Sequence, residues 1–79
     1  MNKKIKENTL DWLESMQAQG FFDGFEEENA NFKNMNDDEL EWYFLNWYFT
    51  DDFINNLEPN EIHEFYSEEL ELRNKLLGV

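Results

Sequence analysis

One stretch of the sequence decides the fold: Leu40-Glu41-Trp42-Tyr43-Phe44-Leu45-Asn46-Trp47-Tyr48-Phe49, in which almost every position is apolar. At about 100° per residue, these side chains form two helical stripes that point in roughly opposite directions. A helix that is apolar all round is normally buried on both sides. We therefore expect a central helix over residues 37–49, covered on one side by the first and last helices. The first stripe holds Leu40, Tyr43, Phe44 and Trp47, with Tyr48 at its edge.

The second stripe has two interpretations. It is either the other half of the core, covered by residues 20–35, or an interface for a second copy of the chain or for another protein. Aromatic anchors beside charged residues are typical of interface hot spots. Under the interface hypothesis, the partner-binding residues are Trp42, Leu45 and Phe49, flanked by Asp38, Glu41 and Asp52.

The residues before the aromatic stretch predict one long helix and one irregular region. An apolar stripe at helical spacing runs through residues 3–19, and Gly20 is a stop signal. Residues 20–35 favour a tight loop or a very short hairpin, followed by a short helix that ends near Lys33, with Phe25 and Phe32 facing inward. The stripe of the first helix holds Ile5, Thr9, Trp12, Leu13 and Met16.

Capping signals mark the later helices. Asn36 and Glu39 have the spacing of a capping box, and Thr50 before two aspartates predicts a short helix through residue 57. Pro59 suits the first turn of a last helix that ends near Leu77. Together these elements predict an all-α fold, a small helical bundle of three long helices plus one or two short helices, in a single domain over residues 1–79. The inward stripe of the last helix is Ile62, Phe65, Tyr66, Leu72, Leu76 and Leu77, and Glu69 and Arg73 have the spacing of an ion pair.

Charge is the strongest signal of function. The 79 residues carry a formal net charge of −13, and Lys33 is the only base between residues 21 and 72. Such a field repels nucleic acids and anionic lipids and attracts basic proteins. The chain has no cysteine, and its basic start is not followed by an apolar run. We therefore expect a cytoplasmic protein with no disulfide, no secretion signal and no membrane span.

The sequence offers no recognisable catalytic or metal-binding motif. His63 is the only histidine, and Ser67 stands where a zinc-protease motif needs the second one. Asn60 stands where a di-metal carboxylate motif needs a glutamate. Leu57 and Pro59 occupy positions where an EF-hand loop has calcium ligands. We therefore expect no enzyme activity, no cofactor and no metal, and place His63 at the surface or the rim of an interface.

Carboxylates at helical spacing could imitate a polyanion. Duplex DNA carries one negative charge per about 1.7 Å of its axis, and a helical row of acids has a comparable spacing. A basic groove for nucleic acid could bind such rows through arginine and lysine. One expected row consists of Glu61, Glu64, Glu68 and Glu71, and a second one begins with Asp37, Asp38 and Glu41.

In its small size, acidity, aromatic content and lack of cysteine, the chain resembles the small phage-encoded inhibitors of bacterial defence, a group that includes DNA-mimicking antirestriction proteins and anti-CRISPR proteins. The resemblance implies a stoichiometric inhibitor in the cytoplasm of a bacterial host. Its partner would be a basic surface of a nuclease or CRISPR effector, with no direct binding to nucleic acid or membrane. Two alternatives stay open: an immunity protein or antitoxin for a basic nuclease toxin, and a structural or assembly protein that forms a homodimer or larger homo-oligomer.

Overall fold

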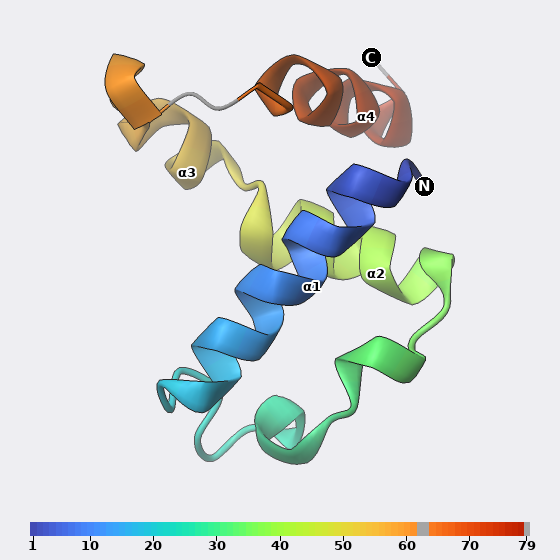
Figure 1. The fold of residues 1–79 in the computed structure, drawn as a ribbon, viewed down its shortest axis with the longest axis vertical. Coiled ribbons are helices and arrows are strands. Elements are labelled where there is room, and N and C mark those ends of the chain that lie inside the picture. The colour runs from blue at the N-terminus through green and yellow to red at the C-terminus, as the bar shows by residue number, and fades with distance from the viewer. Residues whose placement is uncertain (62–63, 79) are drawn as a thin grey trace.

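The computed structural model describes residues 1–61 and 64–78, with the side chain of Glu61 left out. Every regular element in these ranges is helical and none is a strand, which confirms the all-α prediction (Figure 1). None of the described helices is long and apolar enough to cross a lipid bilayer. The α-helices are α1 (Lys3–Ala18), α2 (Asp37–Tyr43), α3 (Asp51–Asn56) and α4 (Tyr66–Leu77).

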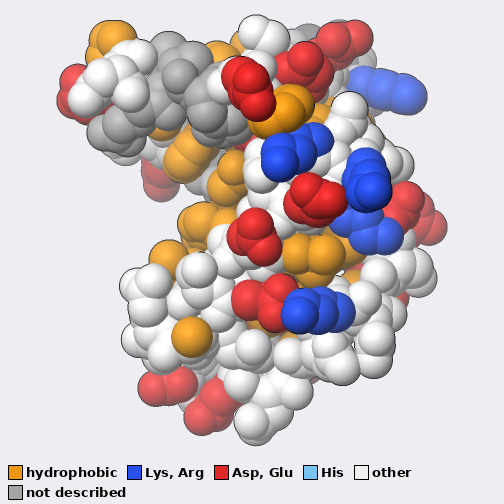
Figure 2. All heavy atoms as spheres, viewed as in Figure 1, with side chains coloured by type: hydrophobic (Ala, Val, Ile, Leu, Met, Phe, Trp, Pro, Cys, Tyr) orange, Lys and Arg blue, Asp and Glu red, His pale blue; other side chains and the backbone are white. Residues whose placement is uncertain are grey.

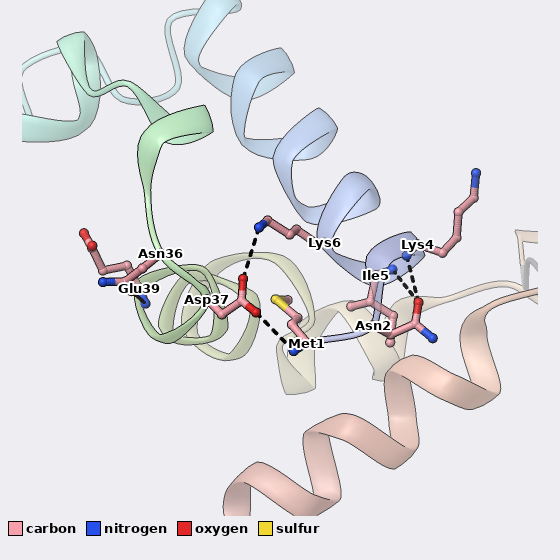
Figure 3. A network of polar contacts seen from close by, with 8 residues as sticks. All are labelled: Met1, Asn2, Lys4, Ile5, Lys6, Asn36, Asp37 and Glu39. Atoms are coloured by element: carbon pink, nitrogen blue, oxygen red, sulfur yellow. Dashed lines mark hydrogen bonds and ion pairs between the residues drawn. The ribbon is translucent and has the colours of Figure 1, made fainter.

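Helix α1 forms where the sequence predicts it. The side-chain oxygen of Asn2 accepts hydrogen bonds from two backbone amides of the first turn, at 2.7 and 3.3 Å (Figure 3). Ile5, Thr9 and Leu13 are buried, and the Thr9 hydroxyl donates to the carbonyl oxygen of Ile5 at 2.8 Å. The helix ends before Gly20, whose φ of +84° is a left-handed conformation that glycine adopts without strain. The predicted helix is therefore confirmed, and three of the five stripe residues are buried, whereas Trp12 and Met16 are only half-buried.

Residues 20–35 form turns and two short 3-10 helices, η1 (Glu26–Asn29) and η2 (Phe32–Asn34). Phe32 is buried as expected, but Phe25 is 59% exposed, so its inward prediction is wrong. Phe22 is the buried aromatic of this turn instead, with its ring centroid 5.8 Å from that of Phe32. The hairpin alternative is also wrong, because this segment contains no strand.

The predicted caps of the two middle helices are confirmed. The side-chain oxygen of Asn36 accepts from the backbone amide of Glu39 at 2.9 Å (Figure 3), which satisfies a free donor at the start of α2. The hydroxyl oxygen of Thr50 accepts from the backbone amide of Phe53 at 3.2 Å and does the same for α3.

The central helix changes its geometry halfway. After Tyr43 it continues as a π-helix, η3 (Phe44–Tyr48), in which the amide of Phe49 bonds to the carbonyl of Phe44 at 2.7 Å. A π-helix bonds residues five apart instead of four, so side chains beyond it are rotated relative to an α-helix. The ring of Phe49 consequently turns inward and stacks on Phe44, with centroids 5.3 Å apart and planes 3° apart. The predicted helix over 37–49 is right in extent, but the orientation predicted for Phe49 is wrong.

The last helix is shorter than the sequence suggests. Pro59–Glu61 is a separate 3-10 helix, η4, and α4 begins only at Tyr66. Phe65 has φ −96° and ψ 4°, outside the usual α region, so the helix starts after it. Gly78, with φ +75°, ends α4 as predicted, whereas Leu77 is 51% exposed and not inward. The predictions for Ile62 and His63 lie outside the described residues.

The hydrophobic core has two parts, and α1 contributes to both. One part holds Ile5, Phe44, Tyr48 and Phe49, and the other holds Leu13, Phe22, Phe32 and Leu40. Helix α4 lies across the end of α1 where the N-terminus is, while η1 and η2 cover the opposite end (Figure 1). The Cα radius of gyration is 12.7 Å, compared with about 11.6 Å for a compact chain of this length. This open arrangement leaves grooves between the segments.

Candidate protein-binding surface

A buried carboxylate joins α4 to the rest of the molecule. Glu69 is fully buried, and its Oε1 accepts from Asn8 Nδ2 at 3.3 Å and from the Tyr48 hydroxyl at 3.4 Å. Burial, with a further contribution from Glu69, raises the pKa of Tyr48, so this hydroxyl stays a donor. The predicted ion pair between Glu69 and Arg73 is wrong, because Arg73 reaches from α4 to Asp51 on α3.

Asp37 forms two ion pairs within the fold. Its carboxylate accepts from Lys6 Nζ at 3.1 Å and from the amino terminus at 3.3 Å (Figure 3). The hydrogen bond from Lys6, followed by that from the amino terminus, holds the pKa of Asp37 below its usual value. Asp37 was predicted to bind a partner, but these contacts already neutralise it and join α2 to the start of α1.

The few bases of the chain are mostly used internally. Lys4 pairs with Glu7 at 3.7 Å, and Lys33 pairs with Glu14 at 3.7 Å. On the face in Figure 2, acidic side chains are scattered widely, whereas the basic ones gather on the right of the view. Many exposed carboxylates form no ion pair within the part of the chain that the structure describes. These are Asp11, Asp23, Glu26, Glu28, Asp38, Glu39, Asp52, Glu58, Glu64, Glu68 and Glu71.

One side of α2 combines these acids with an exposed aromatic ring. Asp38 is exposed, Glu41 is half-buried, and Trp42 is 53% exposed, at the i, i+3, i+4 spacing of a single helical face. The indole packs edge-on against Tyr43, with centroids 4.9 Å apart. We call Asp38, Glu41, Trp42 and Leu45 the α2 face.

The α2 face continues into a groove between the π-helix and α4. Asn46, which lines the groove, donates to the backbone carbonyl oxygen of Trp42 at 2.8 Å. Leu45 is half-buried at the start of the groove, and Leu77 lies on its other side. The groove has a volume of about 380 Å³ and is lined by Leu45, Asn46, Thr50, Asp51, Arg73 and Leu77.

Not all predicted interface residues reach this surface. Phe49 has no exposed area, so its assignment as a partner contact is wrong. The π-helix turned it into the core, and periodicity alone gave no sign of this. Asp52 is exposed, in the first turn of α3. Trp42 and Leu45 are the two members of the predicted apolar stripe that stay at least partly accessible.

The predicted helical row of four glutamates does not form as one row. Glu64 precedes the first residue of α4 and is therefore not on the helix that carries Glu68 and Glu71. The side chain of Glu61 lies outside the described part of the chain. Glu68 and Glu71 are exposed and line a groove of about 230 Å³ beside Asn2, Ile5, Leu72 and Lys75.

A further groove lies between α1 and the residues that lead into α4. It has a volume of about 430 Å³ and is lined by Asn8, Asp11, Trp12, Tyr48, Glu64 and Phe65. We call it the α1 groove. The spacing of Trp12 predicts a place in the core stripe and gives no sign of this groove. The spacing of Asn8, Asp11 and Trp12 marks one face of α1, but no local pattern shows that Glu64 and Phe65 lie opposite it.

Among the described residues, no three histidine or acidic side chains gather closely enough to hold a metal ion. Comparison of the chain with protein-family models, curated proteins and solved structures gives no match.

Proposed function

We propose that the chain is a stoichiometric inhibitor that binds a basic nucleic-acid-binding surface of another protein, such as a nuclease or CRISPR effector. The observation that carries this proposal is the set of exposed carboxylates that form no ion pair with any of the described residues. Unpaired surface charge of one sign destabilises a compact chain by self-repulsion, and it accelerates association with a partner of opposite charge. A basic partner would supply the missing cations.

The α2 face is the part of the surface best suited to the first contact. Trp42 supplies an exposed aromatic anchor, and Asp38 and Glu41 supply charge on the same side of the helix. Tryptophan is enriched among residues that dominate binding energy, and charges at the rim mainly set the association rate. Asp38 and Glu41 are three residues apart, or about 4.5 Å along the axis. This is comparable with the rise of about 3.4 Å per phosphate along the axis for one DNA strand.

Two other functions are alternatives, and the surface fits the first of them better than the second. An immunity protein or antitoxin for a basic nuclease would use the same charges, so it differs in the identity of the target and not in the surface. A homo-oligomer would have to form through Trp42 and Leu45 without Phe49, whose ring is buried. It would also bring two chains of net charge −13 together.

Affinity capture from a bacterial lysate tests the proposal. The immobilised chain is washed, and bound protein is released either with a salt gradient or with a short DNA duplex. We expect a basic nucleic-acid enzyme to be released by both, and to lose its activity when mixed with the chain in equal amounts. A captured enzyme that keeps full activity at saturation would contradict the inhibitor function.

A pair of matched charge variants tests the location. Asp38→Lys with Glu41→Lys reverses two charges on the α2 face, and Glu26→Lys with Glu28→Lys makes the same change on η1. We expect the first variant to associate on the order of tenfold more slowly than the second, because charges near the contact dominate steering. Equal slowing would show that only net charge matters. Light scattering on the free chain distinguishes the homo-oligomer.

A further inference from the structure

We propose that the α1 groove is a receptor for a single arginine side chain of the basic partner, an inference that rests on the proposed function. The groove combines aromatic walls with carboxylates at its edge. Trp12, Tyr48 and Phe65 supply the rings, and Asp11 and Glu64 are exposed acids without an ion pair in the described structure. A planar cation needs two features in a binding site: an aromatic ring face on which it can stack, and a negative charge with which it can pair.

The walls of the groove are held in place before any ligand arrives. The rings of Trp12 and Tyr48 are 5.7 Å apart and tilted by 45°. Trp12 also meets Phe21 edge-on at 6.1 Å. The Tyr48 hydroxyl and the Asn8 amide both donate to the buried Glu69, which fixes one wall on α1 and another on the π-helix. A preformed site loses little side-chain entropy on binding.

The charge of the groove selects the class of occupant. An anion would be repelled by Asp11 and Glu64, and an uncharged apolar group would desolvate them without compensation. A cation pairs with them, and the chain contains an example of the same chemistry. Lys4 places its ammonium 5.5 Å from the ring centroid of Phe65, at the edge of the groove. The groove therefore fits a cationic side chain.

Arginine fits better than lysine for two reasons. The guanidinium group is planar, so it can lie against the Trp12 indole, and it presents a fork of donors that can reach a carboxylate while stacked. It is also more weakly hydrated than an ammonium group, so it costs less to bring into a groove lined by rings. Basic surfaces that bind nucleic acid are rich in arginine, which makes this residue type available on the proposed partner.

Titration with N-acetyl-arginine amide, followed by two-dimensional NMR, tests the proposal on the intact chain. We expect saturable shifts of the Trp12 indole and of the Asn8 side-chain amide, weaker shifts with the lysine analogue, and none with the uncharged citrulline analogue. The double variant Asp11→Asn with Glu64→Gln keeps the shape of the groove. It should bind about tenfold more weakly, a change of about 1.4 kcal/mol. Glu26→Gln with Glu28→Gln is the matched control and should bind like the parent chain.

Three results would overturn the proposal: equal weakening in both double variants, shifts spread over all surface carboxylates, or equal binding of the citrulline analogue. The test is separate from that of the proposed function. If a captured enzyme is inhibited equally by the parent chain and by the Asp11→Asn, Glu64→Gln variant, the arginine receptor is wrong and the inhibitor function stands. If the amide binds in the groove but no basic protein is captured, the receptor stands and the inhibitor function fails.

Discussion

Replacing Phe49 with alanine should remove a large part of the stability of the chain. The ring is fully buried and stacks on Phe44 at 5.3 Å. It also contacts Phe53 at 5.5 Å and Tyr66 at 5.8 Å, so it joins the π-helix, α3 and α4. Truncating a buried aromatic ring costs about 3–5 kcal/mol. A chain of 79 residues has a total unfolding free energy of only about 4–12 kcal/mol.

Thermal and urea denaturation, followed by circular dichroism, measure this loss. At about 2.1 cal/mol/K of unfolding entropy per residue, a loss of 3–5 kcal/mol lowers the Tm by about 18–30 °C. Phe49→Leu, which keeps most of the apolar volume, should lose about 1–2 kcal/mol and is the variant to use if the alanine variant does not fold.

The control for this prediction is Trp42→Ala. Trp42 belongs to the same stripe as Phe49 in an ideal α-helix, but its side chain is 53% exposed. Its removal should lower the unfolding free energy by about 1–2 kcal/mol, because about half of the residue is already in contact with water. Equal losses in Trp42→Ala and Phe49→Ala would refute the rotation that the π-helix introduces.

Three further predictions concern single contacts. Glu69→Ala should destabilise the chain by about 1–3 kcal/mol for each buried donor left without its acceptor, measured by urea unfolding. Because Lys6 and the amino terminus lower the pKa of Asp37, their contribution to stability is present above about pH 4 and is lost as the pH falls further. Asp37→Asn should therefore flatten the decline of Tm between pH 5 and pH 2, and an unchanged slope would contradict this. Gly20→Ala should cost about 1–2 kcal/mol, since φ is +84° and the added Cβ would lie 2.9 Å from a carboxylate oxygen; a Tm equal to that of the parent would contradict it.

The parts of the fold that sequence predicts well are set by neighbouring residues. The sequence predicts Asn36 and Thr50 as helix caps, and both accept hydrogen bonds from first-turn amides. Asn2 also caps a helix, without having been predicted to do so. The stripe of α1 was also expected, because its spacing and its stop at Gly20 lie within one segment. Caps and helical periodicity need only a few residues of context, and they are therefore visible in a single sequence.

The parts that sequence did not predict depend on contacts between distant segments. Glu69 has the spacing of a surface ion pair with Arg73, and the approach of Asn8 and Tyr48 helps to make its burial favourable. The α1 groove likewise exists only because Glu64 and Phe65 come to lie beside α1. On the α2 face, Asp38, Glu41 and Trp42 could be predicted, since they precede the point at which the helix changes its geometry.

The π-helix also has a consequence for chain length. Removing one residue from Phe44–Tyr48 would allow ordinary α-helical bonding, and the residues that follow would keep roughly their present direction, because the π-turn holds one residue more than an α-turn. Phe49 would then stay in the core, whereas a one-residue deletion in α2 would rotate everything that follows by about 100° relative to what precedes it. The central helix can thus be described as an α-helix that carries one extra residue within a single turn. A one-residue deletion should therefore be tolerated better in the π-helix than in the α-helical turns before it.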